Sequence, residues 1–178
     1  VFALAPQPLL MLLGHLLGDL QPADVFQLHR EPASWAWLSE GEVQPLVVRR
    51  PDEHSGLPAL VLSLSGTITV DRVTAVLGPN ACIWTVTIAC PNNDYLKRPE
   101  QLQEFRETAR KLLDQIKAAH GQGVVLHVFP AAPVAICVEL GRALMPKVDL
   151  PLRVYDAHKR RGDFAHALDL NTDGGGSR

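Results

Sequence analysis

Apolar residues along the chain follow two alternating spacings. Short apolar runs bounded by Gly or Pro, at residues 57–65, 81–89 and 124–129, predict buried β-strands. After Pro99, apolar residues recur every three or four positions and predict a helix of about 20 residues, long enough to return the chain by about 30 Å. The next strand can then lie parallel to the previous one. This alternation is typical of an α/β fold. The helical stripe consists of Leu102, Phe105, Ala109, Leu112, Ile116 and Ala119.

Two stretches of the chain repeat one another, with residue 1 aligned to residue 128. Each copy reads as a strand, a Pro-rich turn, a helix and a second strand, which is a βαβ unit. In the first copy we expect strands at 1–4 and 24–29, and in the second copy at 124–129 and 151–156. Pro130 and Pro133 are expected to end a strand and start the helix, and Pro146 to stop that helix. The identical pairs are Val1 and Val128, Phe2 and Phe129, Ala5 and Ala132, Pro6 and Pro133, Leu13 and Leu140, Gly14 and Gly141, and Leu17 and Leu144.

The duplication predicts a single α/β domain over residues 1–178. We expect two Rossmann-like halves related by a pseudo-two-fold axis, with parallel-rich sheets flanked by helices. Residues 1–57 would form the first half, 58–170 the second half, and 171–178 a flexible tail.

The apolar N-terminal stretch does not have the pattern of a secretion signal. No Lys or Arg precedes Arg30, and Pro6 and Pro8 interrupt the apolar run, which is also too short to cross a membrane. The sequence does not begin with Met, so we expect the first half to be truncated at its N-terminus.

Composition narrows the classes of function. A formal net charge of −2 excludes a generally basic nucleic-acid coat, so any anion must be held by a local cluster of cations. Cys82, Cys90 and Cys137 are an odd number without CxxC spacing, which favours free thiols and a reducing cytosol. Each lies in an apolar run and is expected to be buried. The histidines have no metal-ligand spacing, so no zinc site is expected.

In an open parallel sheet, ligands bind outside the carboxyl ends of the strands. Two equivalent loops leave such ends, "APQP" and "PAAP", and each leads into a helix. The backbone N–H groups of a helix start attract phosphate, although a tight turn that needs small residues explains the same pattern. The candidate residues in and beside these loops are Pro6, Gln7, Phe129, Pro130, Ala131 and Ala132.

A second pair of equivalent loops carries cations. "HREPASWAW" supplies Arg30, Trp35 and Trp37, and "DAHKRR" supplies Asp156, Lys159 and Arg160. Across a pseudo-two-fold axis these loops would line one cleft suited to a small anion with flat rings, because Arg grips phosphate and Trp stacks on bases. The alternatives are that the tryptophans anchor the core and that the cations form a solvated run.

A third loop, "CPNNDYLKRP", follows the strand at 81–89 and offers Asn92, Tyr95 and Lys97. These side chains supply an amide, a ring and a cation. They contact a ligand or form an ordinary polar loop before the next helix, and the sequence leaves both interpretations open.

The stretch "VVLHVFPAAPVAICVELGRALMPKVDLPLRVYD" resembles the C-terminal signature of SAVED domains, and the first 37 residues resemble their first half. The resemblance implies two fused CARF-like subunits that act as a sensor in bacterial antiphage defence of the CBASS type. Such domains bind a cyclic oligonucleotide made by a partner nucleotidyltransferase and then self-associate, which activates a fused effector.

The segment from His29 to Trp37 most resembles the effectors that join an HNH nuclease to a SAVED domain. By this resemblance the ligand would be a cyclic dinucleotide of the cyclic GMP–AMP type or a trinucleotide. A nuclease domain would precede residue 1 and would alone contact duplex DNA. The chain itself would bind no membrane, work in the bacterial cytoplasm and catalyse nothing.

Two other functions compete with the sensor hypothesis. A CARF-like phosphodiesterase that degrades the cyclic oligonucleotide would need a general base, for which Asp156, His158 and Lys159 are the clustered candidates. A nicotinamide- or nucleotide-cofactor domain would need GxGxxG or GxxxxGK[ST] after a strand, and the sequence has neither. No cofactor is therefore expected.

Overall fold

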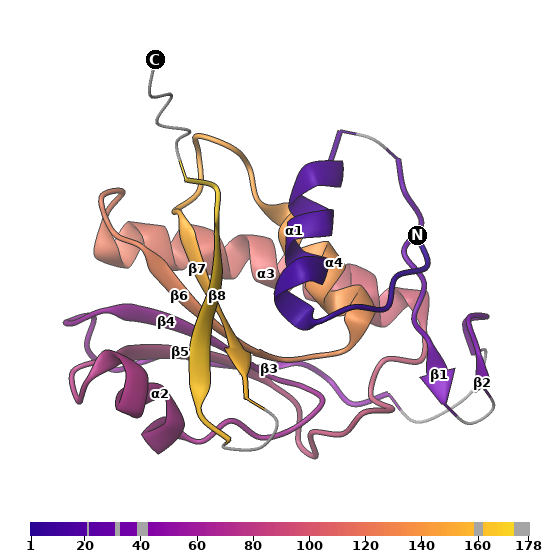
Figure 1. Cartoon of the computed structure of the whole chain (residues 1–178), viewed down its shortest axis with the longest axis horizontal. Helices are drawn as coiled ribbons and strands as arrows, with labels where there is room; N and C mark the ends of the chain where they lie inside the picture. The colour runs from indigo at the N-terminus through magenta and orange to yellow at the C-terminus, as the bar shows by residue number, and fades with distance from the viewer. Residues whose placement is uncertain (21, 31–32, 39–42, 159–161, 173–178) are drawn as a thin grey trace.

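The computed structural model describes residues 1–20, 22–30, 33–38, 43–158 and 162–172, which form a six-stranded sheet and a separate two-stranded hairpin (Figure 1). The sheet has the order β3-β5-β4-β6-β7-β8, in which the four inner strands are parallel and the two outer strands antiparallel to their neighbours. The predicted strands at 57–65, 81–89, 124–129 and 151–156 are confirmed as β4 to β7. The strands of the sheet are β3 (Val47–Arg49), β4 (Pro58–Ser63), β5 (Cys82–Thr87), β6 (Leu126–Ala131), β7 (Leu152–Ala157) and β8 (Phe164–Leu170).

Helices cover both faces of this sheet. Leu60 and Leu62 of β4 belong to the same core as the apolar stripe of α3 and most of α4, while Ala59 and Val61 point to the opposite face, where Val73 of α2 packs. All of β4 is buried, as expected for a central strand of a parallel sheet. The predicted long helix is confirmed as α3. The helices are α1 (Gln7–Leu17), α2 (Val70–Leu77), α3 (Pro99–His120) and α4 (Val134–Ala143).

Pro130 lies inside β6, so the prediction that it ends the strand is wrong. The ladder of β6 with β7 stops at Val128, whereas the ladder with β4 continues to Ala131, whose carbonyl accepts the Leu64 N–H (2.9 Å). Because neighbouring residues turn their backbone groups to opposite sides, Pro130 faces the side where pairing has already ended. Its missing N–H therefore costs no ladder hydrogen bond.

Four further elements differ from the sequence-based expectation. Helix α4 ends at Ala143, before Pro146 is reached. Helix α2 and strand β8 were not predicted, because α2 is short and β8 exposes most of its side chains, so neither has a clear apolar period. Strand β3 is a short edge strand that the pattern also missed.

The strands predicted at 1–4 and 24–29 are wrong as secondary structure, although the two segments do lie side by side. The Phe26 N–H donates to the Val1 carbonyl (3.0 Å), but no ladder joins the two segments, and of their residues only His29 pairs in a strand. Two extended segments without further described neighbours are marginal as a sheet. The chain instead forms a short hairpin of β1 (His29–Arg30) and β2 (Ala33–Ser34).

Helices α1 and α4 cross at their glycines, and the contact is reciprocal. A Cβ atom on Gly14 would lie 1.9 Å from the Val138 carbonyl oxygen, and one on Gly141 would lie 2.0 Å from the Met11 carbonyl oxygen. Gly14 and Met11 are the repeat equivalents of Gly141 and Val138. Each helix therefore presents to the other the contact that it receives, as a two-fold axis requires. The predicted pseudo-two-fold relation of the two copies is confirmed at this crossing.

Aromatic stacking is repeated between the copies, but burial is not. The ring of Phe2 stacks on Phe26 with centroids 4.6 Å apart, and the ring of Phe129 stacks on Tyr155 with centroids 4.5 Å apart. Phe129 is fully buried at 0% exposure, whereas Phe2 is 64% exposed. In the second copy Val73 of α2 belongs to the cluster around Phe129, and no described helix takes that place over Phe2.

Each stacked pair also receives a third ring edge-on. Trp35 meets Phe2 at 5.4 Å and 88°, and Phe164 meets Phe129 at 5.1 Å and 83°. Trp35 lies directly after β2 of the first hairpin, and Phe164 is the first residue of β8 in the second hairpin. In both copies, therefore, the third ring comes from the hairpin that follows the helix.

The burial predicted for the three cysteines is confirmed for two of them. Cys82 and Cys137 are buried, but Cys90 is exposed, because it lies in a loop after the end of β5. All three are free thiols.

No helix in the described part of the chain is both long and apolar enough to cross a membrane.

Candidate functional site

The two equivalent Pro-rich loops meet at one edge of the molecule, and we call residues 5–8 and 130–133 the rim. The Gln7 side chain joins them, because its Nε2 donates to the Ala132 carbonyl (3.1 Å) and its Oε1 accepts the Ala132 N–H (3.4 Å). Pro6 is exposed and Ala131 half-buried, while Phe129, Pro130 and Ala132 are buried. The rim thus brings the starts of α1 and α4 together, as the repeat predicted.

One N–H group at the start of α4 already has a partner within the chain. The Ala135 N–H donates to Gln27 Oε1 (3.3 Å), and Gln27 Nε2 donates to the Leu28 carbonyl (3.0 Å). Gln27 is buried and was missed by the sequence analysis. The sequence does contain one sign of its role, because Gln27 is a polar side chain within the otherwise apolar run at 25–28. Its bond removes one of the helix-start donors that a phosphate could have used.

Loops that leave the other parallel strands gather beside the rim. The Ala131 carbonyl accepts the Ser65 N–H (2.7 Å) after β4, and the Asn92 N–H donates to the Leu64 carbonyl (2.9 Å) after β5. The Asn92 side chain bonds within its own loop, to the Cys90 carbonyl (2.7 Å) and the Asp94 N–H (2.9 Å). The carboxyl ends of β4, β5 and β6 therefore converge, as expected for an open parallel sheet.

Tyr95 and Lys97 have different positions in the third candidate loop. The Tyr95 ring is buried in the core, and burial raises the pKa of its hydroxyl. Gln101 Nε2 donates to its carbonyl (3.1 Å), which ties the loop to α3. Lys97 is half-buried, and its carbonyl accepts the Leu38 N–H (3.0 Å) from the segment after the β1–β2 hairpin. The structure thus brings this loop against the first copy.

The tryptophans contact other aromatic rings of the first copy. Trp35 and Trp37 are both half-buried, and Trp37 lies 6.5 Å from the Phe26 ring and 6.1 Å from the His29 ring. Burial lowers the pKa of His29, a shift that Asp94 opposes. Both tryptophans therefore contribute to packing and still keep surface for a ligand.

The charged candidates lie on the two hairpins. Arg30 is exposed at the turn of the β1–β2 hairpin, and Asp156 is exposed near the end of β7. The His158 N–H donates to the Asp163 carbonyl (2.8 Å) across the equivalent turn. Lys159 and Arg160 lie outside the described residues.

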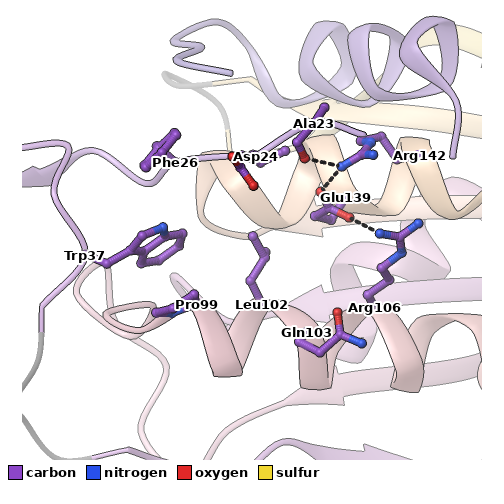
Figure 2. Close-up of a pocket in the computed structure, with 11 residues that line it drawn as sticks. Ala23, Asp24, Phe26, Trp37, Pro99, Leu102, Gln103, Arg106, Glu139 and Arg142 are labelled. Atoms are coloured by element: carbon purple, nitrogen blue, oxygen red, sulfur yellow. Dashed lines mark hydrogen bonds and ion pairs between the residues drawn. The ribbon is translucent and has the colours of Figure 1, made fainter. Parts of the chain in front are cut away.

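A cleft of about 390 Å³ opens between the two copies on the side of the molecule (Figure 2). The segment at 23–26 and Trp37 form one wall, and the first half of α3 with Glu139 and Arg142 of α4 forms the other. The sequence analysis named Trp37 but missed the rest of the cleft lining. The segment at 23–26 and the two residues of α4 are more than a hundred residues apart in the chain, so local sequence does not bring them together.

A buried ion pair lies at the inner end of this cleft. Arg142 Nη1 donates to Glu139 Oε1 (2.8 Å) and to the Ala23 carbonyl (2.8 Å), and Arg142 Nε donates to the Gly18 carbonyl (3.1 Å). Both charged side chains are buried. These bonds attach the turn after α1 to the last turn of α4. The pair therefore helps to hold the two copies together.

The repeated loop–helix unit, the crossed helices and the converging loops define a Rossmann-like α/β domain. The chain belongs to the SAVED family: the model of the "SMODS-associated and fused to various effectors sensor domain" matches residues 1–170. The family's domains are sensors. No curated protein sequence matches the chain.

Solved structures of a SAVED/CARF-domain receptor, Cap4 of Acinetobacter baumannii, have the same fold. Its complex with the cyclic trinucleotide 2′3′3′-cAAA superposes with a TM-score of 0.67 at 14% identity, over 96% of this chain and 38% of the receptor. Its complex with 3′3′3′-cAAA gives a TM-score of 0.66 at 14% identity, with the same coverage of both chains. The chain thus spans 38% of the length of that receptor.

Proposed function

We propose that the chain senses a cyclic oligonucleotide, which binds over the rim. The observation that carries the proposal is the double hydrogen bond between Gln7 and Ala132, which holds the starts of α1 and α4 at one edge. The positive ends of two helix dipoles there favour a ligand with several phosphates. Arg30 is exposed on the neighbouring hairpin and supplies a cation. Membership in a family of sensor domains supports the proposal.

The ligand in this proposal is a cyclic dinucleotide of the cyclic GMP–AMP type or a cyclic trinucleotide. The Acinetobacter baumannii receptor with the same fold binds cyclic trinucleotides of adenine, which supports the larger ring. The predicted contacts outside the rim are Arg30, Trp35, Trp37, Asn92, Lys97, Asp156, Lys159 and Arg160. Tyr95 contributes by shaping its loop, since its ring is buried.

Binding would be transmitted by self-association, which would activate a nuclease fused before residue 1, of the HNH type. The family description, a sensor fused to various effectors, supports an effector of some kind. In this proposal residues 1–57 and 58–170 are the two CARF-like halves, the nuclease alone contacts duplex DNA, and the protein works in the bacterial cytoplasm. Sedimentation of the chain with and without ligand tests the self-association.

A calorimetric panel of cyclic di- and trinucleotides tests ligand binding. We expect affinity in the micromolar range or tighter for one member, and a loss of about tenfold in Arg30→Ala or Lys159→Ala, because each removes a charge-assisted contact to phosphate. Lys111→Ala is the matched control, since Lys111 is an exposed cation on α3 far along the helix from the rim. A panel in which no ring binds contradicts the proposal.

The competing function is a phosphodiesterase that opens the ring. Asp156 near the carboxyl end of β7 and His158 just after it are both exposed, and in this alternative they would reach a ligand over the rim. Incubation of the ligand with the chain, followed by chromatography, separates the two functions. Recovery of intact ring supports the sensor, and a linear product that disappears in His158→Ala supports the enzyme.

A further inference from the structure

The side cleft of Figure 2 is separate from the rim. The segment at 23–27 runs along α4, bonded to Arg142 in the last turn through the Ala23 carbonyl and to Ala135 in the first turn through Gln27. Glu139 lies four residues after Ala135, which is about 6 Å further along the helix axis. The cleft therefore opens below the helix starts. It shares Trp37 with the contacts proposed for the cyclic oligonucleotide, but none of the rim residues.

One side of the cleft is aromatic and apolar. Figure 2 shows Phe26 and Trp37 beside the start of α3, where Pro99 and Leu102 complete the surface. The rings of Phe26 and Trp37 are tilted by 30° to one another with centroids 6.5 Å apart. Trp37 is half-buried, so part of its face remains open. Flat aromatic ligands gain stacking energy on such a surface.

The opposite side carries an acceptor and a donor next to one another. Glu139 Oε2 is buried and has no hydrogen-bond partner among the described residues. Arg106 Nη1 lies 3.8 Å from it, beyond hydrogen-bond distance, and the Arg106 side chain is 35% exposed. The ion pair with Arg106 leaves this buried carboxylate oxygen without a hydrogen bond, and a bound donor would recover the free energy that this costs. Arg106 supplies N–H donors at the same place.

We propose that this cleft binds a nucleobase, stacked on Trp37 and hydrogen-bonded along one edge by Glu139 and Arg106. The Watson–Crick edge of a base carries a donor beside an acceptor, for example N6–H and N1 of adenine, and so matches a carboxylate beside a guanidinium. A ligand cation is disfavoured because two arginines flank Glu139. An anion is disfavoured because Glu139 and Asp24 both line the cleft.

The base belongs either to the cyclic oligonucleotide itself or to a separate nucleoside, and the proposal does not require the rim to bind anything. Adenosine and guanosine are therefore the probes, titrated into the chain by calorimetry, with ribose 5-phosphate as the ligand that lacks a base. We expect the nucleosides to bind and ribose 5-phosphate not to bind. The purines present two fused rings to Trp37, which favours them as first probes.

Three variants test the assigned contacts. Arg106→Gln and Trp37→Leu should each weaken nucleoside binding by about tenfold, the effect of one charge-assisted hydrogen bond or one stacked ring. Glu139→Gln should weaken it similarly, and its folding is checked by circular dichroism because Glu139 also pairs with Arg142. Lys111→Gln, an exposed substitution on α3 outside the cleft, should bind as the wild type does. Arg106 is partly exposed, so Arg106→Gln keeps the test decisive if Glu139→Gln does not fold.

A cyclic adenine trinucleotide added as competitor identifies the source of the base. Displacement of adenosine assigns the cleft to a base of the ring, and simultaneous binding assigns it to a separate nucleoside; both support the proposal. Absence of nucleoside binding at millimolar concentration, or unchanged binding in both Arg106→Gln and Trp37→Leu, overturns it. A cyclic ligand that fails to bind while adenosine still does contradicts the proposed function alone.

Discussion

The α-carbon of Gly141 in α4 packs directly against the carbonyl oxygen of Met11 in α1, with no room for a side chain between the two helices. Gly14 makes the equivalent contact with Val138. The two helices therefore lie closer together than a side chain at either glycine would permit. The rim and the side cleft both depend on this crossing, since each is lined by residues from both copies.

Gly141→Ala is expected to destabilise the fold. The added methyl group would lie 2.0 Å from the Met11 carbonyl oxygen, so the helices must separate, at a cost of about 1–3 kcal/mol or more. Urea unfolding measures the change. Gly123→Ala is the control, because a Cβ atom there meets nothing within 4 Å, and its effect should stay within about 0.5 kcal/mol. Equal stability of the two variants would contradict the close crossing.

The equivalent phenylalanines should respond differently to truncation. Phe129→Ala removes a fully buried ring and is expected to cost about 3–5 kcal/mol, the range for large cavities. Phe2→Ala removes a ring that stacks in the same way but is 64% exposed, and should cost about 1 kcal/mol. The same denaturation assay compares them. A loss at Phe2 as large as that at Phe129 would show that burial is not what separates the copies.

Arg142→Met is expected to cost about 3–5 kcal/mol, because it removes the hydrogen-bonded cation of the buried Glu139 carboxylate, leaves only the longer ion pair with Arg106, and frees two backbone carbonyls. Arg153→Met is the comparison, since Arg153 pairs with Asp169 at the surface, where solvent screens the ion pair, and its loss should change stability far less. Thermal and urea unfolding of both variants provide the measurement. A cost for Arg142→Met no larger than that for Arg153→Met is the contradicting result.

The fold should lose stability as the pH falls below the ordinary histidine value of 6.5. Burial lowers the pKa of His29, His120 and His127 below that value, with further lowering of His120 by the nearby His54. The folded chain therefore holds these rings neutral, while the unfolded chain takes up protons first. The stabilisation is complete above pH 6.5 and is lost as the pH falls towards the folded pKa values, by at most about 1.4 kcal/mol per group and pH unit.

Urea midpoints at pH 7.5 and pH 5.5 test this dependence. The Asp169 carboxyl, whose pKa Arg153 holds below its usual value of 3.8, loses its contribution only at lower pH, so it does not interfere. In His127→Gln part of the pH dependence should disappear, because that imidazole, whose Nδ1 lies 2.9 Å from the Tyr155 hydroxyl, no longer titrates. A midpoint that is higher at pH 5.5 would contradict the sign.

The equivalence of the two Pro-rich loops could be read from local sequence. The offset repeat aligned the loop at residues 5–8 with the loop at 132–135, and the structure brings Gln7 of the first against Ala132 of the second. The loops meet because the equivalent helices that follow them pack against one another. Tyr95 did not follow its local pattern, since a ring in a polar loop reads as exposed and this one is buried against α3.

The sequence by itself determined the inner strands β4 to β7 and the long helix α3, because apolar spacing reports which side of each element meets a core. It also determined the pairing of the two copies, because small residues recur at matching positions in α1 and α4. Only the tertiary structure decided that β6 continues through Pro130, that Gln27 takes a donor at the start of α4, and that a cleft opens between residues 23–26 and α3. These features depend on contacts between residues far apart in the chain, and local spacing contains no information about such distances.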